Sequence, residues 1–283
     1  MDLLQQGPLE SRILEHQGGQ ELTVDDVLLV DKGPVTTLTL NRPERLNALN
    51  RELGTLFIRT IMEVGFDPAV RVIVVRGQGR SFCAGDDVSG TSPPDPSYDR
   101  SDPITAGRLG HYWQLQRAIR VVPRPVIVRV HGHCMGAGMD LTLASDYAVA
   151  ADTSVFGVVF IKRAIAAGTV MLPRHVGLKR ATEMLFEGES ITADKALQLG
   201  LITRVCREGE LDHQVDDLAT KLASGATRTL GLIKHGLNQA YFPALEDELQ
   251  DMALLQQFAT KSEDSAEARL AWRERRKPVF VGR

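Results

Sequence analysis

Two short segments rich in glycine and alanine each follow an apolar run that contains many β-branched residues. The first segment, residues 81–88 (SFCAGDDV), follows the run 70–76, and the second, residues 131–140 (HGHCMGAGMD), follows the run 126–130. Small residues at the end of a strand allow backbone N–H groups to face a ligand. If both turns converge on one carbonyl oxygen, their N–H groups form an oxyanion hole that stabilises negative charge on that oxygen.

Asp140 ends the second segment and is a candidate for acid–base chemistry. The sequence predicts a helix over residues 138–144, so Asp140 lies in its first turn. There the carboxyl group could face a ligand and move a proton. It could equally be a structural residue, since the helix dipole favours an acid at this end by about 0.3–1 kcal/mol. The residues alone leave both interpretations open.

The elements that must position these residues alternate between strands and helices. Predicted strands cover residues 27–31, 35–41, 70–76, 126–130 and 146–150. Predicted helices cover residues 44–65, 106–120 and 138–144, and most of the chain from 178 onward. Strands that alternate with helices indicate parallel βαβ units, and hence an α/β fold.

The chain divides into three parts in this interpretation. Residues 1–24 are polar and weakly periodic, so we expect a poorly ordered extension or a short flanking helix. Residues 25–210 form the α/β core, and residues 211–283 form a helical C-terminal region whose last polar helix is predicted at 272–277. Four prolines in residues 90–103 predict a loop within the core.

Composition excludes several classes of protein. The net charge is −3 over 283 residues, which argues against nucleic acid as a partner. The three cysteines form no CxxC pair, so we expect no disulfide framework and no metal site, and a cytoplasmic location. No apolar run approaches the roughly 18 residues of a membrane helix, and no signal peptide is evident at the start.

The two small-residue segments resemble the motifs of the crotonase superfamily, also called the enoyl-CoA hydratase/isomerase superfamily. Further segments match in the same order and spacing: residues 41–49 (NRPERLNAL), 124–127 (RPVI), 144–147 (ASDY), 172–177 (LPRHVG), 193–201 (ADKALQLGL) and 262–280. The resemblance extends over residues 27–281. It implies a ββα spiral core with a helical C-terminal region that forms trimers, which pair into hexamers.

The resemblance also implies roles for individual residues. The N–H groups of Ala84 and Ala137 are expected to hold the thioester oxygen of an acyl-CoA, and Asp140 is expected to be the acid/base. Coenzyme A is then part of the substrate, and no separate cofactor is expected. Residues implied to contact the CoA or acyl group are Arg45, Leu46, Ala48, Ala84, Gly85, Asp86, Asp87, Val88, Gly136, Phe160, Arg276, Lys277 and Phe280. Asp86 stands where the family commonly has a small residue.

The chain departs from the family pattern at Phe160. Hydratases of the family carry a second glutamate a few residues after a Phe-Gly pair, and Phe160 occupies that position after Phe156 and Gly157. Hydration by two carboxylates therefore lacks one acid, whereas a single carboxylate can still move a proton between two carbons. Candidates for a replacement acid or base are His111, Tyr112 and Lys162, although His111 also suits a helix cap and Tyr112 a pocket wall.

Three classes of function follow from this pattern. The first is a hydratase/isomerase of fatty acid metabolism, a lyase or isomerase acting on an unsaturated acyl-CoA. The second is a hydrolase or carbon–carbon bond-cleaving enzyme in which Asp140 and a histidine activate water. The third is a non-catalytic protein that binds CoA esters, because one catalytic acid is replaced. Cys83 is expected to be a buried packing residue, since no partner histidine is identifiable.

Overall fold

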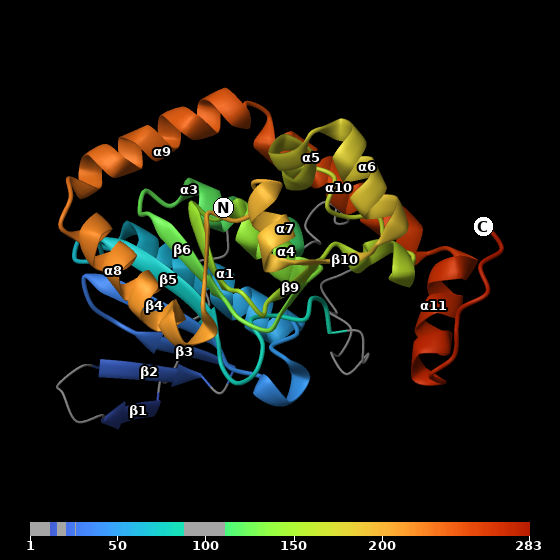
Figure 1. The fold of residues 1–283 in the computed structure, drawn as a ribbon, viewed down its shortest axis with the longest axis horizontal. Coiled ribbons are helices and arrows are strands. Elements are labelled where there is room, and N and C mark those ends of the chain that lie inside the picture. Colours follow the sequence, from blue (N-terminus) through green and yellow to red (C-terminus); the bar gives the residue numbers. More distant parts are fainter. Residues whose placement is uncertain (1–11, 16–20, 26, 88–110) are drawn as a thin grey trace.

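A computed structural model describes residues 12–15, 21–25, 27–87 and 111–283. Its main sheet has eight strands, in the order β1-β2-β3-β4-β5-β6-β8-β11 (Figure 1). The strands are β1 (Arg12–Glu15), β2 (Glu21–Asp25), β3 (Leu28–Asp31), β4 (Val35–Leu40), β5 (Val72–Gly77), β6 (Val126–Val130), β8 (Tyr147–Ala151) and β11 (Arg204–Cys206). Strands β1 to β4 pair antiparallel, and the pairs from β4 to β11 are parallel, which confirms the predicted α/β class.

A second, three-stranded sheet contains residues 133–135, in the middle of the second glycine-rich segment. It contains β7 (His133–Met135), β9 (Val155–Gly157) and β10 (Ser190–Thr192), in the order β10-β9-β7. Strand β7 runs parallel to β9, with Met135 opposite Gly157. Strand β7 connects the end of β6 to the helix that contains Asp140.

The helices surround the main sheet and extend away from it at one end (Figure 1). They are α1 (Arg51–Phe66), α3 (His111–Val121), α4 (Ala137–Ala144), α5 (Met171–Val176), α6 (Leu178–Glu187), α7 (Ala193–Gln198), α8 (Leu211–Ala223), α9 (Thr227–Tyr241), α10 (Leu245–Thr260) and α11 (Glu263–Arg273). Short 3-10 helices cover Pro43–Arg45, Val159–Arg163 and Glu208–Glu210.

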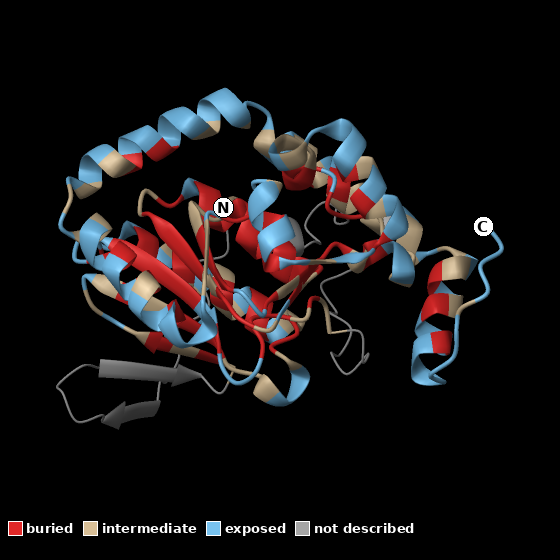
Figure 2. Ribbon diagram, viewed as in Figure 1, coloured by how far each residue is buried: buried red, intermediate tan, exposed pale blue. Residues whose placement is uncertain are grey.

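The central strands of the main sheet, β5, β6 and β8, are largely buried on both faces because helices cover each face. In β5, Ile73 and Val75 join the core that also contains side chains of α1, α3 and α4. Val72 and Val74 point to the other face, where they pack with α8. A strand buried on both faces reads as a continuous apolar run, which is why residues 70–76 were recognisable. Figure 2 shows the same pattern, with buried strands in the centre and exposed residues along α9.

Helix α4 lies inside the molecule, and all eight of its residues are buried. It has no solvent-facing side, so its sequence is apolar all round except for Asp140 and Thr142. Thr142 donates a hydrogen bond to the carbonyl oxygen of Gly138 at 2.9 Å, which satisfies its hydroxyl group within the helix. Asp140 is therefore the one ionisable side chain in this fully buried helix.

Three parts of the chain differ from the sequence predictions. Residues 12–15 and 21–25 form an antiparallel pair instead of a flanking helix, because strands this short carry little periodic signal. The helix predicted from residue 44 begins at Arg51, where the Asn50 side chain accepts a hydrogen bond from the N–H of Leu53 at 2.9 Å. The last helix is α11, not residues 272–277; Arg275 has a φ of 55°, which the α-helix does not allow.

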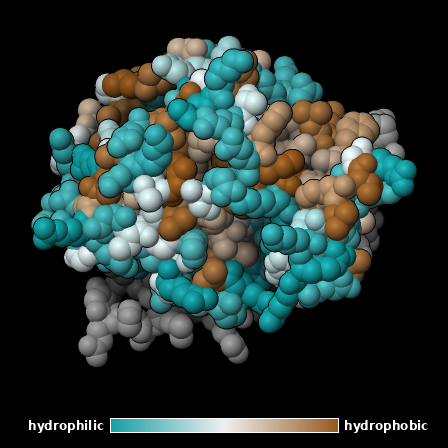
Figure 3. Space-filling view, turned by 45° about the vertical axis from the view of Figure 1, so that its right-hand side comes forward, coloured by the Kyte–Doolittle hydropathy of each residue, from teal (hydrophilic) through white to brown (hydrophobic). Residues whose placement is uncertain are grey.

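Helices α6, α10 and α11 expose large apolar side chains, and Figure 3 shows hydrophobic patches among hydrophilic ones on the side that they occupy. Phe186, Phe258 and Trp272 are 76%, 70% and 42% exposed, respectively. Within the described residues, no helix is both long enough and apolar enough to span a membrane. The predicted loop at 90–103 and the start of the helix predicted at 106 lie outside the described residues.

Candidate active site

The two glycine-rich segments lie side by side, as the sequence predicted. The N–H of Cys83 donates to the carbonyl oxygen of His133 at 3.0 Å, and the N–H of Met135 donates to the carbonyl oxygen of Cys83 at 2.9 Å. Gly85 and Gly136 come shortly after these bonded residues in the chain, and they have φ angles of 99° and 49°, respectively. A Cβ atom on Gly85 would lie 3.1 Å from the carbonyl oxygen of Met135, so a larger residue would force the segments apart.

The N–H group of Ala84 is bonded inside the protein, which corrects its predicted role. It donates to the carbonyl oxygen of Leu46 at 2.9 Å. Leu49 bonds to the two residues on either side of Asp86. Its N–H donates to the carbonyl oxygen of Gly85, and its carbonyl oxygen accepts from the N–H of Asp87. In such a parallel pairing the residue between them, Asp86, directs its own N–H away from Leu49. Asp86, not Ala84, therefore turns its amide away from the neighbouring segment.

Ala137 is the first residue of α4 and is 1% exposed. The N–H groups in the first turn of a helix have no acceptor within the helix, and together they favour a negative charge. The chain before Ala137 is fixed, because the N–H of Gly136 donates to the carbonyl oxygen of Gly157 at 2.9 Å. The start of α4 is thus a rigid donor group next to the 81–87 turn.

Asp140 is 4% exposed, and burial raises the pKa of its carboxyl group to about 8. The charge of Asp86 raises the pKa further, whereas the side chain of Gln116 opposes the rise. A carboxyl group with this pKa is mostly protonated at neutral pH and can both give and take a proton there. Burial and the raised pKa are the two observations that bear on the acid–base interpretation of Asp140.

Asp87 has a structural partner. Its carboxylate lies 2.7 Å from Nη2 of Arg42, and both side chains are nearly buried. Arg42 also donates to the carbonyl oxygen of Ala48, so the pair ties the 42–49 segment to the 81–87 turn. Leu46 is half-buried and Ala48 is buried along this segment, whereas Arg45 is exposed. Val88 lies outside the described residues.

Phe160 forms part of the wall beside the start of α4. It is 6% exposed, and its ring would lie 3.6 Å from a Cβ atom on Gly136 and 3.0 Å from one on Gly168. The position expected to hold a second carboxylate therefore presents an aromatic ring. The apolar ring adds no charge near Asp140.

The other predicted residues are not brought to Asp140 by the described part of the chain. Lys162 pairs with Glu189 at 3.2 Å on the surface. Arg276 bonds to Glu267 and Glu274, and Lys277 and Phe280 lie exposed beyond α11. Helix α3 begins at His111, but the structure does not describe the side chains of His111 and Tyr112.

Two further residues of the glycine-rich segments have structural roles. Burial raises the pKa of the Cys83 thiol to about 12, so it stays protonated, in agreement with the packing interpretation. His131 contacts the carbonyl oxygen of Gly79 through Nε2 and Arg129 through Nδ1, and burial lowers its pKa. Within the described residues, no group of three or more His, Cys, Asp or Glu side chains is placed to hold a metal ion.

Gln116 of α3 is a buried polar residue near Asp140 that the sequence did not single out. Its side chain is 1% exposed, and neither Nε2 nor Oε1 has a hydrogen-bonding partner in the described part of the chain. It is nevertheless close enough to Asp140 to affect the pKa of that carboxyl group. The available signal was a polar residue flanked by the buried positions Leu115, Ala118 and Ile119 of one helix.

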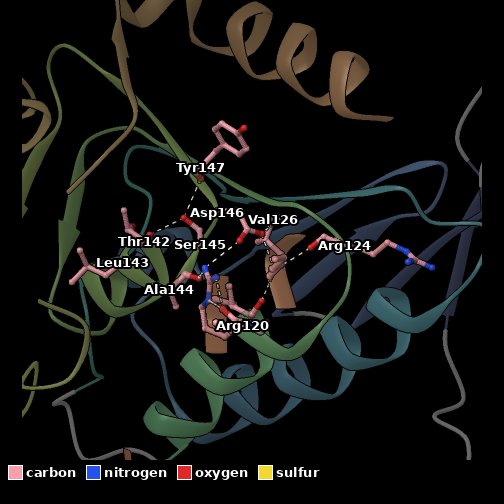
Figure 4. A network of polar contacts seen from close by, with 12 residues as sticks. Arg120, Arg124, Val126, Thr142, Leu143, Ala144, Ser145, Asp146 and Tyr147 are labelled. Carbon is pink, nitrogen blue, oxygen red and sulfur yellow. Dashed lines mark hydrogen bonds and ion pairs between the residues drawn. The ribbon is translucent and has the colours of Figure 1, made fainter. Parts of the chain in front are cut away.

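A buried polar network holds α3, α4 and α9 together (Figure 4). Arg120 of α3 donates to the carbonyl oxygen of Ala144 and to the carboxylate of Asp146, each at 3.1 Å. Lys234 of α9 donates to the same carboxylate at 2.7 Å, and the N–H of Val126 does so at 2.9 Å. The network fixes the end of α4, and hence the orientation of its first turn.

Comparison with known proteins agrees with this architecture. The sequence model of a family described as enoyl-CoA hydratase/isomerase matches residues 31–283. The chain is 35% identical over 259 residues to a 1,2-epoxyphenylacetyl-CoA isomerase of Escherichia coli, covering 90% of this chain and 97% of the relative. It is 32% identical over 252 residues to a 2,3-dehydroadipyl-CoA hydratase of the same organism, covering 88% and 96%. A solved enoyl-CoA hydratase/isomerase from Pseudoalteromonas atlantica superposes with a TM-score of 0.80 at 25% identity, covering 90% of this chain and 100% of that one.

Proposed function

Because the chain belongs to the enoyl-CoA hydratase/isomerase family, we propose that it moves a proton on the acyl group of an acyl-CoA thioester. Asp140 is the proton carrier in this proposal. The observation that carries it is the burial of this carboxyl group in the first turn of α4, with a pKa of about 8. The relatives named above also act on CoA esters, according to their names.

The thioester oxygen is held at the start of α4. The N–H of Ala137 donates to it, and the N–H of Asp86 is the second donor because it is turned away from Leu49. When a proton leaves or joins the carbon next to the thioester, negative charge develops on this oxygen. In comparable sites one such donor contributes roughly 3–4 kcal/mol to stabilising that charge.

Asp140 acts on the carbons of the acyl group. In its protonated form it gives a proton to one carbon of the enolate, and as a carboxylate it takes a proton from another. This sequence moves a double bond along the acyl chain and requires one acid–base group. Hydration adds water to the same double bond and needs a second polar group to hold that water, which Phe160 cannot do. Double-bond isomerisation is therefore the reaction that Asp140 can perform alone.

The CoA moiety enters between residues 45–48 and 85–87 in this proposal. Arg45 is exposed at the outer end of this path, where its charge suits a phosphate. Arg276, Lys277 and Phe280 reach CoA from a neighbouring subunit, and the exposed apolar side chains of α10 and α11 form the contact in a trimer or hexamer. Static light scattering measures this assembly, and a monomer at micromolar concentration would contradict it.

Turnover of two substrates tests the proposed reaction. We expect the protein to convert a 3-enoyl-CoA into the 2-enoyl-CoA, measured by chromatography because the mass stays the same. A gain of one water identifies hydration. Release of CoA or a shortened acyl group would show instead a hydrolase or a carbon–carbon bond-cleaving enzyme. Binding of both esters without any turnover would contradict the proposal.

A further inference from the structure

Gln116 is a buried amide to which the described part of the chain supplies no hydrogen-bonding partner. Its side chain lies on α3, is 1% exposed, and has neither its donor nor its acceptor atom bonded in the described part of the chain. Leaving a buried amide without a partner costs free energy, so such groups in proteins usually bond to a ligand or to water. Gln116 is therefore a candidate for contact with the substrate.

The packing of two helices directs this amide toward Asp140. Arg120 lies one turn after Gln116 on α3, and Ala144 lies one turn after Asp140 on α4. Arg120 donates to the carbonyl oxygen of Ala144, which fixes the two helices at this level. One turn earlier, Gln116 and Asp140 face each other, and Gln116 acts on the carboxyl group of Asp140.

The atoms at this point suit one oxygen atom of a ligand. An amide offers a donor and an acceptor, whichever way it is turned, and the protonated carboxyl group of Asp140 offers one of each. An aliphatic acyl chain offers none of these buried polar atoms a hydrogen-bonding partner. A water molecule or a hydroxyl group can bond to both side chains at once.

We propose that Gln116 and Asp140 together bind one oxygen atom next to the acyl chain, which is the attacking water in hydration and the hydroxyl group of a 3-hydroxyacyl-CoA in the reverse direction. This inference rests on the proposed function, because it concerns the acyl side of the same site. Gln116 then holds the water in place of the second glutamate, whose position in this chain is occupied by Phe160. It is a substrate-binding residue that carries no proton.

The hydration step balances with one carboxyl group. One oxygen of Asp140 gives its proton to the α-carbon, and the π electrons of the double bond form the new C–H bond through the enolate. The water oxygen forms a bond to the β-carbon and releases a proton to the other oxygen of Asp140. Gln116 accepts a hydrogen bond from the second O–H of this water, and Asp140 ends in the protonated form in which it began.

Ligand binding to a Gln116→Met variant tests this proposal independently of turnover. Methionine has a similar volume but no amide, so the core stays filled. The probes are 3-hydroxybutyryl-CoA and butyryl-CoA, which differ only in the hydroxyl group, measured by calorimetry. We expect the wild type to bind the hydroxylated ester at least fivefold more tightly, and Gln116→Met to lose this preference. Leu115→Met, in the same buried helix, is the matched control and should keep it.

The outcomes separate this proposal from the proposed function. Equal binding of the two esters by the wild type, or an unchanged preference in Gln116→Met, would overturn the role of Gln116 even if isomerisation occurs. Binding of neither ester by the wild type would overturn both proposals. If the variant loses the preference while it still binds butyryl-CoA within about twofold of the wild-type affinity, the role of Gln116 is supported.

The pH profile gives a readout that packing alone would not move. Gln116 holds down the pKa of Asp140, so Gln116→Met should shift the alkaline limb of hydration to higher pH. The other groups facing this carboxyl are Asp86, from the 81–87 turn, and the Cys134 thiol of β7, which stays protonated because burial raises its pKa. From α5, His175 is held by the carbonyl oxygens of Leu143 and Gly200. An unshifted limb in a folded variant would contradict the contact.

Discussion

Arg120 donates a hydrogen bond to the carbonyl oxygen of Ala144 at 3.1 Å, and this contact fixes α3 against α4 one turn beyond the acid–base residue. The same guanidinium also bonds to Asp146 and Asn238, so it cannot turn toward solvent without breaking several contacts. The position of Asp140 therefore depends on a polar network outside the site. Substitutions in the site and in this network therefore test the chemistry and its structural support separately.

Replacing Asp140 by Asn removes the proton carrier and keeps the shape of the side chain. We expect turnover to fall at least about a hundredfold while CoA-ester binding stays within a few-fold of the wild type. Steady-state kinetics and calorimetry measure the two effects. Asp216→Asn, on the exposed face of α8, is the matched control and should change neither. Unchanged turnover in Asp140→Asn would remove this residue from the mechanism.

The raised pKa of Asp140 also makes stability depend on pH. The folded protein keeps this proton up to about pH 8, whereas the unfolded chain loses it near the ordinary pKa of about 4. Between these values the folded state binds more protons, so its free energy of unfolding falls as the pH rises. Below the lower value this group has no such effect.

The Asp140→Asn variant lacks this titration. We compare the free energy of unfolding of the variant with that of the wild type at each pH. The difference, variant minus wild type, should be larger at pH 8 than at pH 5 by at least about 1.4 kcal/mol, the energy that corresponds to one pKa unit. Urea denaturation at both pH values measures the difference. If the gap between variant and wild type is the same at both, the carboxyl group does not titrate as described.

The wall residue Phe160 can be exchanged for the acid that the family pattern places there. We expect Phe160→Glu to raise hydration of a 2-enoyl-CoA above the wild type, because a second carboxylate then faces the acyl group. Phe160→Leu serves as the control, since it shortens the ring without adding an acid. A folded Phe160→Glu protein with no gain in hydration would show that a missing acid does not limit this reaction.

The Arg120 network should matter for stability as well as for activity. Asp146 accepts bonds from Arg120, Lys234 and the N–H of Val126, so Asp146→Asn leaves two buried cations without their carboxylate. Breaking such a buried pair costs about 3–5 kcal/mol, measured by urea denaturation.

The surface pair of Asp212 with Arg129 gives the comparison for the network. Asp212→Asn should cost only about 0–1 kcal/mol, since the Asp212 side chain is 68% exposed. If both substitutions have equally small effects, the network does not support the fold.

Proline at position 137 removes one backbone donor. Ala137 is the first residue of α4, a position that tolerates proline because its N–H has no partner within the helix. We expect Ala137→Pro to lower turnover by about 10²–10³-fold with the fold retained. Ala193→Pro, at the first position of α7, is the matched control for the effect of proline itself. Similar turnover in both variants would exclude the amide of Ala137.

Much of the core was predictable because its signals are local. The run 70–76 is a strand buried on both faces, and the glycines at 85 and 136 are required where two segments almost touch. These features appear in the sequence as apolar runs and as small residues at their ends. The convergence of the two segments on one site followed from them.

The remaining features depend on contacts between distant segments. The sequence indicated which turn supplies a backbone donor but not which N–H group of that turn. That the N–H of Ala84 is bonded to the carbonyl oxygen of Leu46 is visible only in the structure. Gln116 resembles an ordinary polar residue of a helix until its burial and the absence of a described partner are known. The strands at 12–15 and 21–25 were missed because they are short and pair only with each other and with β3.

A crystal structure of the protein with bound butyryl-CoA tests the central claim most directly. The account predicts the thioester oxygen within about 3.2 Å of the backbone nitrogens of Ala137 and Asp86, with the α-carbon facing the carboxyl group of Asp140. A thioester oxygen that lies away from the nitrogen of Ala137, or an acyl group in a different cavity, would contradict it.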